Sequence, residues 1–281
     1  MIASFLITFR ETLEAALIIG IVLAYLAKTK KTEHNKTVYS AIICAAIASA
    51  IGAFLFSALA GGFEGRAEEI FEGTSMLFAS FLITFTILWM IKQKHMVVHL
   101  HKKITAAFQR QKTQTIWLFF LVFMSVFREG IETVIFLGAA SFATSEGGGV
   151  TGALLGIVIA SILGYIVFNA SKKINIKQFF NITSVMLILF SAGMVSQAVH
   201  EFEEAKLIPA YIEHVWDINP QQNPDGTYPL FHHKGYIGAL FKELFGYSGS
   251  PSLWQVVSYV LYILLIIFLW RKIESVHASQ K

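Results

Sequence analysis

The stretches 9-FRETLEA-15 and 127-FREGIET-133 each place one arginine and two glutamates inside a long apolar run. Both follow the pattern Arg-Glu-x-x-Glu. On a helix the two glutamates of each motif, three residues apart, project from one face. If these runs cross a membrane, each charge at mid-depth costs roughly 2.5–3.5 kcal/mol, and the six together about 15–20 kcal/mol. A pattern this unfavourable that occurs twice predicts a functional site.

The composition of the chain is that of an integral membrane protein. Of its 281 residues 55% are hydrophobic and only 14% are charged, which is too little charge for the surface of a soluble domain of this length. A membrane-spanning helix needs about 20 apolar residues. Seven runs come close to or exceed this length, near residues 2–26, 38–60, 74–91, 116–142, 150–170, 179–199 and 253–270.

Basic residues alternate between the loops that join these runs. Sixteen follow runs one, three, five and seven, and four lie in the other loops. Because cytoplasmic loops are enriched in Lys and Arg, we expect the N-terminus outside and the C-terminus in the cytoplasm. The net charge of +4 is then an orientation signal, and no nucleic-acid partner is expected. We assign His95, His99 and His101, in the third basic loop, to an interfacial helix rather than to a metal site.

The two motifs also indicate an inverted repeat. They align at a constant offset of 118, at which Arg10 corresponds to Arg128 and Glu14 to Glu132. Three runs separate equivalent helices, so the second copy crosses the membrane in the opposite direction, as in many transporters. We therefore expect one all-α integral membrane domain (1–281) of seven transmembrane helices, a 3+3 inverted repeat plus a seventh helix. Its parts are repeat one at about 1–91, repeat two at about 116–199, an external loop at about 200–252 and the seventh span at about 253–270.

The external loop and the single cysteine carry two smaller predictions. All five prolines fall between residues 209 and 251, so the spans are free of proline. Within this loop, 235-GYIGALFKELFG-246 predicts a short amphipathic helix lying on the membrane. Cys44, within the second run, is expected to be a small apolar core residue.

The residue types of the motifs predict a cation site. Four carboxylates offer up to eight oxygen ligands with no thiolate or imidazole, which suits hard di- or trivalent cations. Two guanidiniums leave a formal charge of −2, and they are expected to keep the carboxylates ionised and to limit how tightly a cation is held. A purely structural alternative pairs each arginine with the second glutamate of its motif, which leaves the first glutamate unpartnered, and buried ion pairs stabilise weakly. The predicted ligands are Glu11, Glu14, Glu129 and Glu132, with Arg10 and Arg128 balancing charge.

Two further acidic clusters flank spans on the expected outer face. The alternative is that these glutamates lie in solvated loops without a role in binding. The inner segment that the repeat relates to the first cluster, 171-SKKINIKQ-178, is basic. Acidic residues outside and basic residues inside favour import of a cation. His232 and His233 are not assigned as ligands, because adjacent side chains diverge on regular structure. The residues expected to capture or relay a cation are Glu68, Glu69, Glu72, His200, Glu201 and Glu204.

An Arg-Glu-x-x-Glu motif in the first and fourth of seven spans resembles the high-affinity iron permease family, which includes fungal oxidase-coupled permeases and bacterial ferrous-iron uptake permeases. The resemblance extends to 68-EEIFEG-73, 199-VHEFEEAKLIP-209 and 243-ELFGYSGSPSLWQVVSYVLY-262. It implies a multi-pass protein of the cell membrane in which both motifs translocate iron. It further implies that iron is the transported substrate, that no cofactor is needed, and that an extracytoplasmic oxidase or iron-capture protein is a partner.

Two alternatives stay open beside iron import. The same architecture could import or exchange another hard divalent cation, such as manganese. A membrane di-iron carboxylate oxidase would be an enzyme, but such sites pair glutamates with Glu-x-x-His motifs, and neither span motif contains a histidine. We therefore expect a transporter and not an enzyme.

Overall fold

In the computed structural model the described residues are 1–92, 114–143, 149–169, 176–220, 228–232 and 235–278. Regular structure within them is helical. The predicted interfacial segment around His95, His99 and His101 lies outside the described residues. The elements are α1 (Ile2–Lys28), the short 3-10 helix η1 (Thr32–His34), α2 (Asn35–Ala60), α3 (Arg66–Lys92), α5 (Gln114–Ala143), α6 (Gly149–Asn169), α7 (Ile176–Glu204), α8 (Tyr236–Phe245) and α9 (Leu253–Ala278).

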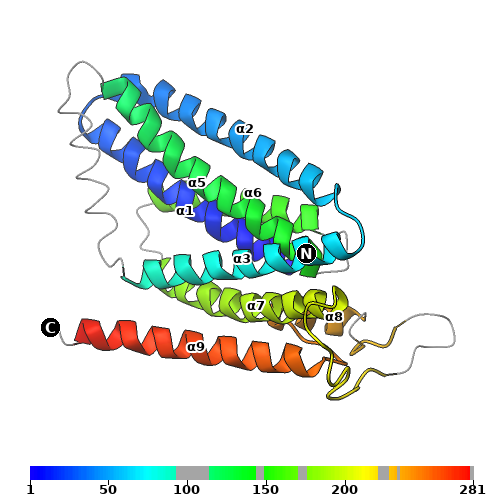
Figure 1. Cartoon of the computed structure of the whole chain (residues 1–281). Helices are drawn as coiled ribbons and strands as arrows, with labels where there is room; N and C mark the ends of the chain where they lie inside the picture. Colours follow the sequence, from blue (N-terminus) through cyan, green and yellow to red (C-terminus); the bar gives the residue numbers. More distant parts are fainter. Residues whose placement is uncertain (93–113, 144–148, 170–175, 221–227, 233–234, 279–281) are drawn as a thin grey trace.

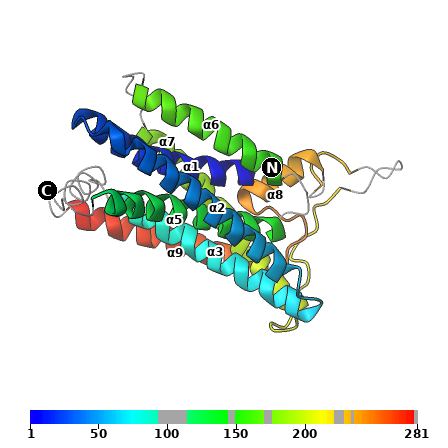
Figure 2. The same ribbon diagram turned by 90° about the horizontal axis from the view of Figure 1, so that it is seen from above.

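The long helices form one elongated bundle (Figure 1). α1 packs along α6, α2 along α5 and α3 along α7, while α1 and α5 meet between these pairs. Figure 2 shows α6 at one edge beside α1, and α9 lies on the other side, against α7. The N-terminus and α8 lie at one end of the bundle, which we call the α8 end, and the C-terminus lies at the opposite end.

A continuous apolar core joins the central helices. It contains the fully or almost fully buried side chains of Ile7, Ile83, Phe136, Leu187 and Met194. These come from α1, α3, α5 and α7, so four helices are fixed relative to one another around the segment that carries the charged motifs.

Five helices are long and apolar enough to cross a membrane, namely α2, α3, α6, α7 and α9. α1 and α5, with 27 and 30 residues, have the length but are not among these five, because three charged residues interrupt each of them. Five of the seven predicted spans therefore meet this criterion, and the two that do not are the helices with the motifs.

The outer faces of the bundle are apolar, as expected for a surface in contact with lipid. Phe54 on α2 is 73% exposed, and Phe268 on α9 is 63% exposed. Cys44 is also exposed on α2, so its predicted place in the core is wrong. α2 buries Val38, Ala41 and Ala45, and an apolar sequence does not distinguish a side chain facing protein from one facing lipid.

α3 and α7 extend beyond the predicted spans 74–91 and 179–199. α3 begins at Arg66 and α7 ends at Glu204. The two acidic clusters consequently lie on helices rather than in loops, and their side chains are held at helical spacing.

The predicted helix at 235–246 is confirmed as α8, Tyr236–Phe245. It packs against α7 and α1 rather than standing apart on a membrane surface. Gly246 ends α8 in the left-handed conformation, φ 66°, which favours glycine. Its backbone lies against Gly193 of α7, where an added Cβ would fall 2.4 Å from Gly246 Cα. The docking of α8 therefore requires glycine on both sides.

Candidate metal centre

The first motif lies on the buried side of α1. Arg10 has no exposed surface and Glu11 is 1% exposed. Arg10 Nη1 lies 2.7 Å from Glu11 Oε1, and Arg10 Nη2 lies 3.0 Å from Glu14 Oε1. One guanidinium therefore faces two carboxylates, so the group that the structural alternative leaves unpartnered also has a contact.

The second motif repeats these contacts on α5 in a more open environment. Arg128 Nη2 lies 3.1 Å from Glu129 Oε1, and Arg128 Nε lies 3.1 Å from Glu132 Oε1. The Arg128 side chain, however, is 45% exposed, whereas Arg10 is 0% exposed. The two motifs are thus alike in their internal contacts and unlike in their surroundings.

Carboxylates of the two motifs converge between α1 and α5. Glu11, Glu14 and Glu129 each offer one oxygen atom, and these atoms all lie within 4.8 Å of one another. Metal–oxygen distances of about 2.0–2.6 Å separate opposite ligands by about 4–5 Å, so one ion fits between these oxygens. The donor set contains only carboxylate oxygens, which suits a hard divalent cation.

The carboxylates retain oxygen atoms available to a ligand. Glu11 Oε2 and Glu129 Oε2 are buried and have no hydrogen-bond partner among the described residues, while Glu14 Oε1 is ion-paired with Arg10. Leaving such atoms unsatisfied in the interior is costly. An ion held between the motifs would satisfy both unpartnered oxygens, and it would offset the excess negative charge of the motifs.

Glu132 lies beside this group rather than within it. Its Oε2 accepts a hydrogen bond of 3.2 Å from the Thr86 hydroxyl of α3, while its Oε1 pairs with Arg128. The structure therefore gathers three of the four predicted ligands and holds the fourth through a neighbouring helix.

Three residues that the sequence did not point to also shape the centre. Thr86 fixes Glu132, and the Trp89 ring lies 5.2 Å from Arg128 Cζ in a cation–π contact. Gly130, between the two glutamates of its motif, lies against Ser49 of α2, and an added Cβ would fall 2.0 Å from Ser49 Oγ. Isolated Thr, Trp and Gly residues in apolar helices carry no signal of such roles.

The two acidic clusters come together at the α8 end. Glu72 of α3 is an electrostatic neighbour of Glu201 and Glu204 of α7. The two helices approach closely there, since a Cβ on Gly73 would fall 2.7 Å from the Phe202 ring. Of the predicted capture residues, Glu201 is buried, the side chains of Glu69, Glu72 and His200 are half-buried, and Glu68 and Glu204 are exposed.

The α7 cluster is internally bonded. The Gln197 amide donates to Glu201 Oε1 at 2.9 Å, and His200 Nε2 lies 3.3 Å from Glu204 Oε1. The Ser252 hydroxyl at the start of α9 donates to Glu203. Side chains of this cluster are therefore held by their own helix and by α9 before any cation arrives.

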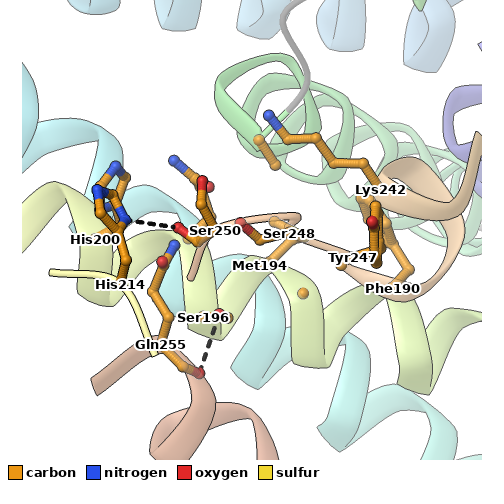
Figure 3. A pocket seen from close by; sticks show the side chains of 14 residues that line it. Phe190, Met194, Ser196, His200, His214, Lys242, Tyr247, Ser248, Ser250 and Gln255 are labelled. Carbon is orange, nitrogen blue, oxygen red and sulfur yellow. Dashed lines mark hydrogen bonds between the residues drawn. The ribbon is translucent and has the colours of Figure 1, made fainter. Parts of the chain in front are cut away.

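A cavity of about 250 Å³ opens beside this cluster (Figure 3). Gln197 and His200 of α7 line it, as do Gln255 of α9 and Ala143 at the end of α5. His214 also lines it, with Nδ1 3.4 Å from the Ser250 carbonyl oxygen. The cavity thus reaches α7 next to the acidic residues. Of the histidine pair not assigned as ligands, His232 is buried and His233 lies outside the described residues.

Comparisons with known proteins agree with the geometry. The model of the Iron permease FTR1 family matches residues 1–278. The chain is 33% identical over 272 residues to "Ferrous iron permease EfeU" of Yersinia pestis, covering 95% of this chain and 93% of that protein. It is 30% identical over 266 residues to the protein of that name from Escherichia coli O6:H1, covering 94% and 93%. No solved structure matches the chain.

Proposed function

Because the chain belongs to the Iron permease FTR1 family, we propose that it imports iron across the cell membrane through a carboxylate site shared by its two Arg-Glu-x-x-Glu motifs. The observation that carries this proposal is the convergence of Glu11, Glu14 and Glu129 within 4.8 Å of one another, in the interior of a membrane-embedded bundle. Relatives that share its full length are named as ferrous iron permeases, and ferrous iron is a cation that such oxygen ligands accept.

The path is built, in this proposal, from seven spans arranged as an inverted repeat. Under the repeat α1 corresponds to α5, α2 to α6 and α3 to α7. The packing of α1 along α6 and the packing of α5 along α2 are then equivalent contacts, related by the two-fold axis of the repeat. The contacts of α1 with α5 and of α3 with α7 each join two equivalent helices across that axis. Substrate sites of inverted-repeat transporters lie at such an interface near mid-membrane.

The direction of transport is inward. The basic loops support a C-terminus in the cytoplasm, and in this proposal the α8 end, with its acidic residues, faces outward. Glu72, Glu201 and the neighbouring carboxylates concentrate cations at the entrance by their negative potential. An inside-negative membrane potential then favours entry by about 2.3 kcal/mol per charge per 100 mV.

The arginines make the site reversible. With both ionised, the two motifs have a formal charge of −2, so one divalent ion neutralises the centre. Without the guanidiniums the excess charge would hold the ion far more tightly and slow its release. Arg10, in contact with both Glu11 and Glu14, competes directly with the ion for these oxygens.

A second cation is favoured by one specific observation, the all-oxygen ligand set, which manganese also accepts. An exchange of iron for protons is compatible with glutamates that lose their cation at mid-membrane.

An extracytoplasmic oxidase or capture protein would deliver iron to the acidic residues at the entrance.

Uptake of radioactive iron into proteoliposomes, under an inside-negative potential, tests the proposal. Ferrous and ferric-chelate forms are compared for the unmodified protein, for Glu14→Gln/Glu132→Gln, and for Glu33→Gln/Glu213→Gln, which changes two exposed carboxylates. We expect at least a tenfold loss in the first variant and none in the second. Undiminished uptake by Glu14→Gln/Glu132→Gln would refute the proposed path. Competition with manganese ranks the two metals.

A further inference from the structure

α3 and α7 cross at a symmetric pair of serines. The Ser80 hydroxyl donates to the Ser191 carbonyl at 3.2 Å, and the Ser191 hydroxyl donates to the Ser80 carbonyl at 3.3 Å. This exchange is what a two-fold axis between the helices produces. It relates each residue of α3 to the residue 111 positions later on α7.

The relation pairs two residues at the metal centre with two residues at the cavity. Thr86 corresponds to Gln197, and Trp89 corresponds to His200. On α3 both residues act on the second motif, because Thr86 donates to Glu132 and Trp89 stacks on Arg128.

The α7 counterparts are engaged elsewhere. By the repeat, their partners on α1 are Glu14 and Arg10. Gln197 instead donates to Glu201, and His200 faces Glu204, and both line the cavity. Meanwhile Arg10 Nε is buried without a hydrogen-bond partner among the described residues, and Glu14 Oε1 is paired with Arg10 of its own motif.

We propose that Gln197 and His200 are positioning residues for the first motif. When the cavity closes, Gln197 contacts Glu14 and His200 contacts Arg10. In that state Thr86 no longer contacts Glu132, and Trp89 no longer contacts Arg128. The inference rests on the proposed function and its inverted repeat. In such a repeat the two halves exchange conformations between the two states of the transporter, so contacts made by one half in one state are made by the other half in the next.

The chemistry of the exchange is consistent. An amide N–H of Gln197 replaces the Thr86 hydroxyl as donor to a carboxylate, and the imidazole of His200 replaces the Trp89 indole against a guanidinium. Gln197 and His200 both border the 250 Å³ cavity, which gives their side chains room to leave Glu201 and Glu204. When Gln197 leaves Glu201, that carboxylate loses a donor and becomes available to the next cation.

α8 supplies the opposite wall. Lys242, on α8, and Gly246, which ends it, line the same cavity, and Figure 3 shows Lys242 at the opposite end of it from His200. The cavity therefore lies between α7 and α8.

Labelling of a cysteine in the cavity tests the inference. Ala143→Cys lines the cavity, and Cys44→Ser removes the native thiol. A membrane-impermeant maleimide is added from outside to this background, and to the same background carrying Thr86→Ala or Gln197→Ala. Thr86→Ala weakens the open-cavity state and Gln197→Ala weakens the closed state. We expect labelling at least threefold slower in Thr86→Ala than in Gln197→Ala.

Equal rates in the two variants, or the reverse order, would overturn the inference, provided that both elute as the unmodified protein does. Thr86→Ser keeps the hydroxyl and removes the methyl group, and we expect it to label at the rate of the background protein. If the side chain of Thr86 only filled space, this variant would instead label like Thr86→Ala. The labelling needs no iron. A failure of the proposed function would appear in the uptake assay, whereas a failure of this inference would appear only in the labelling ratio.

Discussion

Glu14 of α1 and Glu129 of α5 present carboxylate oxygens to each other within 4.8 Å in the protein interior. Two like charges at this distance repel strongly in a medium of low dielectric constant. Arg10 and Arg128 reduce this repulsion from either side, yet Glu11 Oε2 and Glu129 Oε2 remain buried without a hydrogen-bond partner among the described residues. The arrangement is therefore least stable when empty, and its stability depends on cations.

Arg10→Ala should lower the free energy of unfolding in detergent by about 3–5 kcal/mol, because it leaves buried carboxylates without their counter-charge. Ferrous iron should restore part of this loss, measured as the shift of the thermal unfolding midpoint. Arg128→Ala is the matched control. Since Arg128 is 45% exposed while Arg10 is 0% exposed, its loss should cost less than the loss of Arg10. Equal costs for the two variants would contradict the difference in environment.

Gly130→Ala should destabilise the protein by about 1–3 kcal/mol through overpacking, because its Cβ would overlap Ser49 Oγ. Ser49→Gly in the same chain should recover most of the loss. Gly61→Ala, whose nearest atom would lie at 3.4 Å, serves as the control. A double variant no more stable than Gly130→Ala would show that α2 and α5 do not meet at this point.

Neutralising the outer carboxylates should weaken capture and leave transport itself intact. Replacement of Glu69, Glu72, Glu201 and Glu204 by Gln should raise the KM for iron about tenfold at low salt, with little change in the maximal rate, since long-range attraction falls with charge. The difference should shrink at high ionic strength because salt screens exposed charges. A loss of maximal rate with unchanged KM would place these residues in the translocation step instead.

Metal preference should follow the oxygen ligands. Manganese should compete with ferrous iron for uptake, and Cu(I), which prefers thiolate and thioether ligands, should not. The measurement is the inhibition of radioactive iron uptake at increasing competitor concentration. Inhibition by Cu(I) at lower concentration than manganese would contradict an all-carboxylate site.

Hydropathy alone located the helices, because the length of an apolar run is set by the membrane. The run at 2–26 became α1, Ile2–Lys28, and the amphipathic stretch at 235–246 became α8. The start of α3 and the end of α7 could not be located in this way, since the first turns of α3 and the last turn of α7 are acidic and polar. Cys44 was misplaced because a residue facing lipid and a residue in the core have the same apolar character.

The charged residues of the site could be predicted from the sequence, because charge within an apolar run is conspicuous. Glu11, Glu14 and Glu129 converge, but nothing in the motifs shows that Glu132 is held by Thr86 from another helix. The difference between Arg10 and Arg128 was also hidden, because repeated sequences predict equal environments. It depends on the neighbours that each half meets in one conformation of the bundle.

The number of high-affinity ferrous ions bound per chain tests the central claim most directly, that two motifs form one site. Equilibrium dialysis of purified protein, in a background with the four outer glutamates changed to Gln, compares the parent with Glu14→Gln and Glu129→Gln. We predict one ion per chain in the parent and loss of that ion in each variant. Two ions per chain, with each variant losing one, would contradict a shared site.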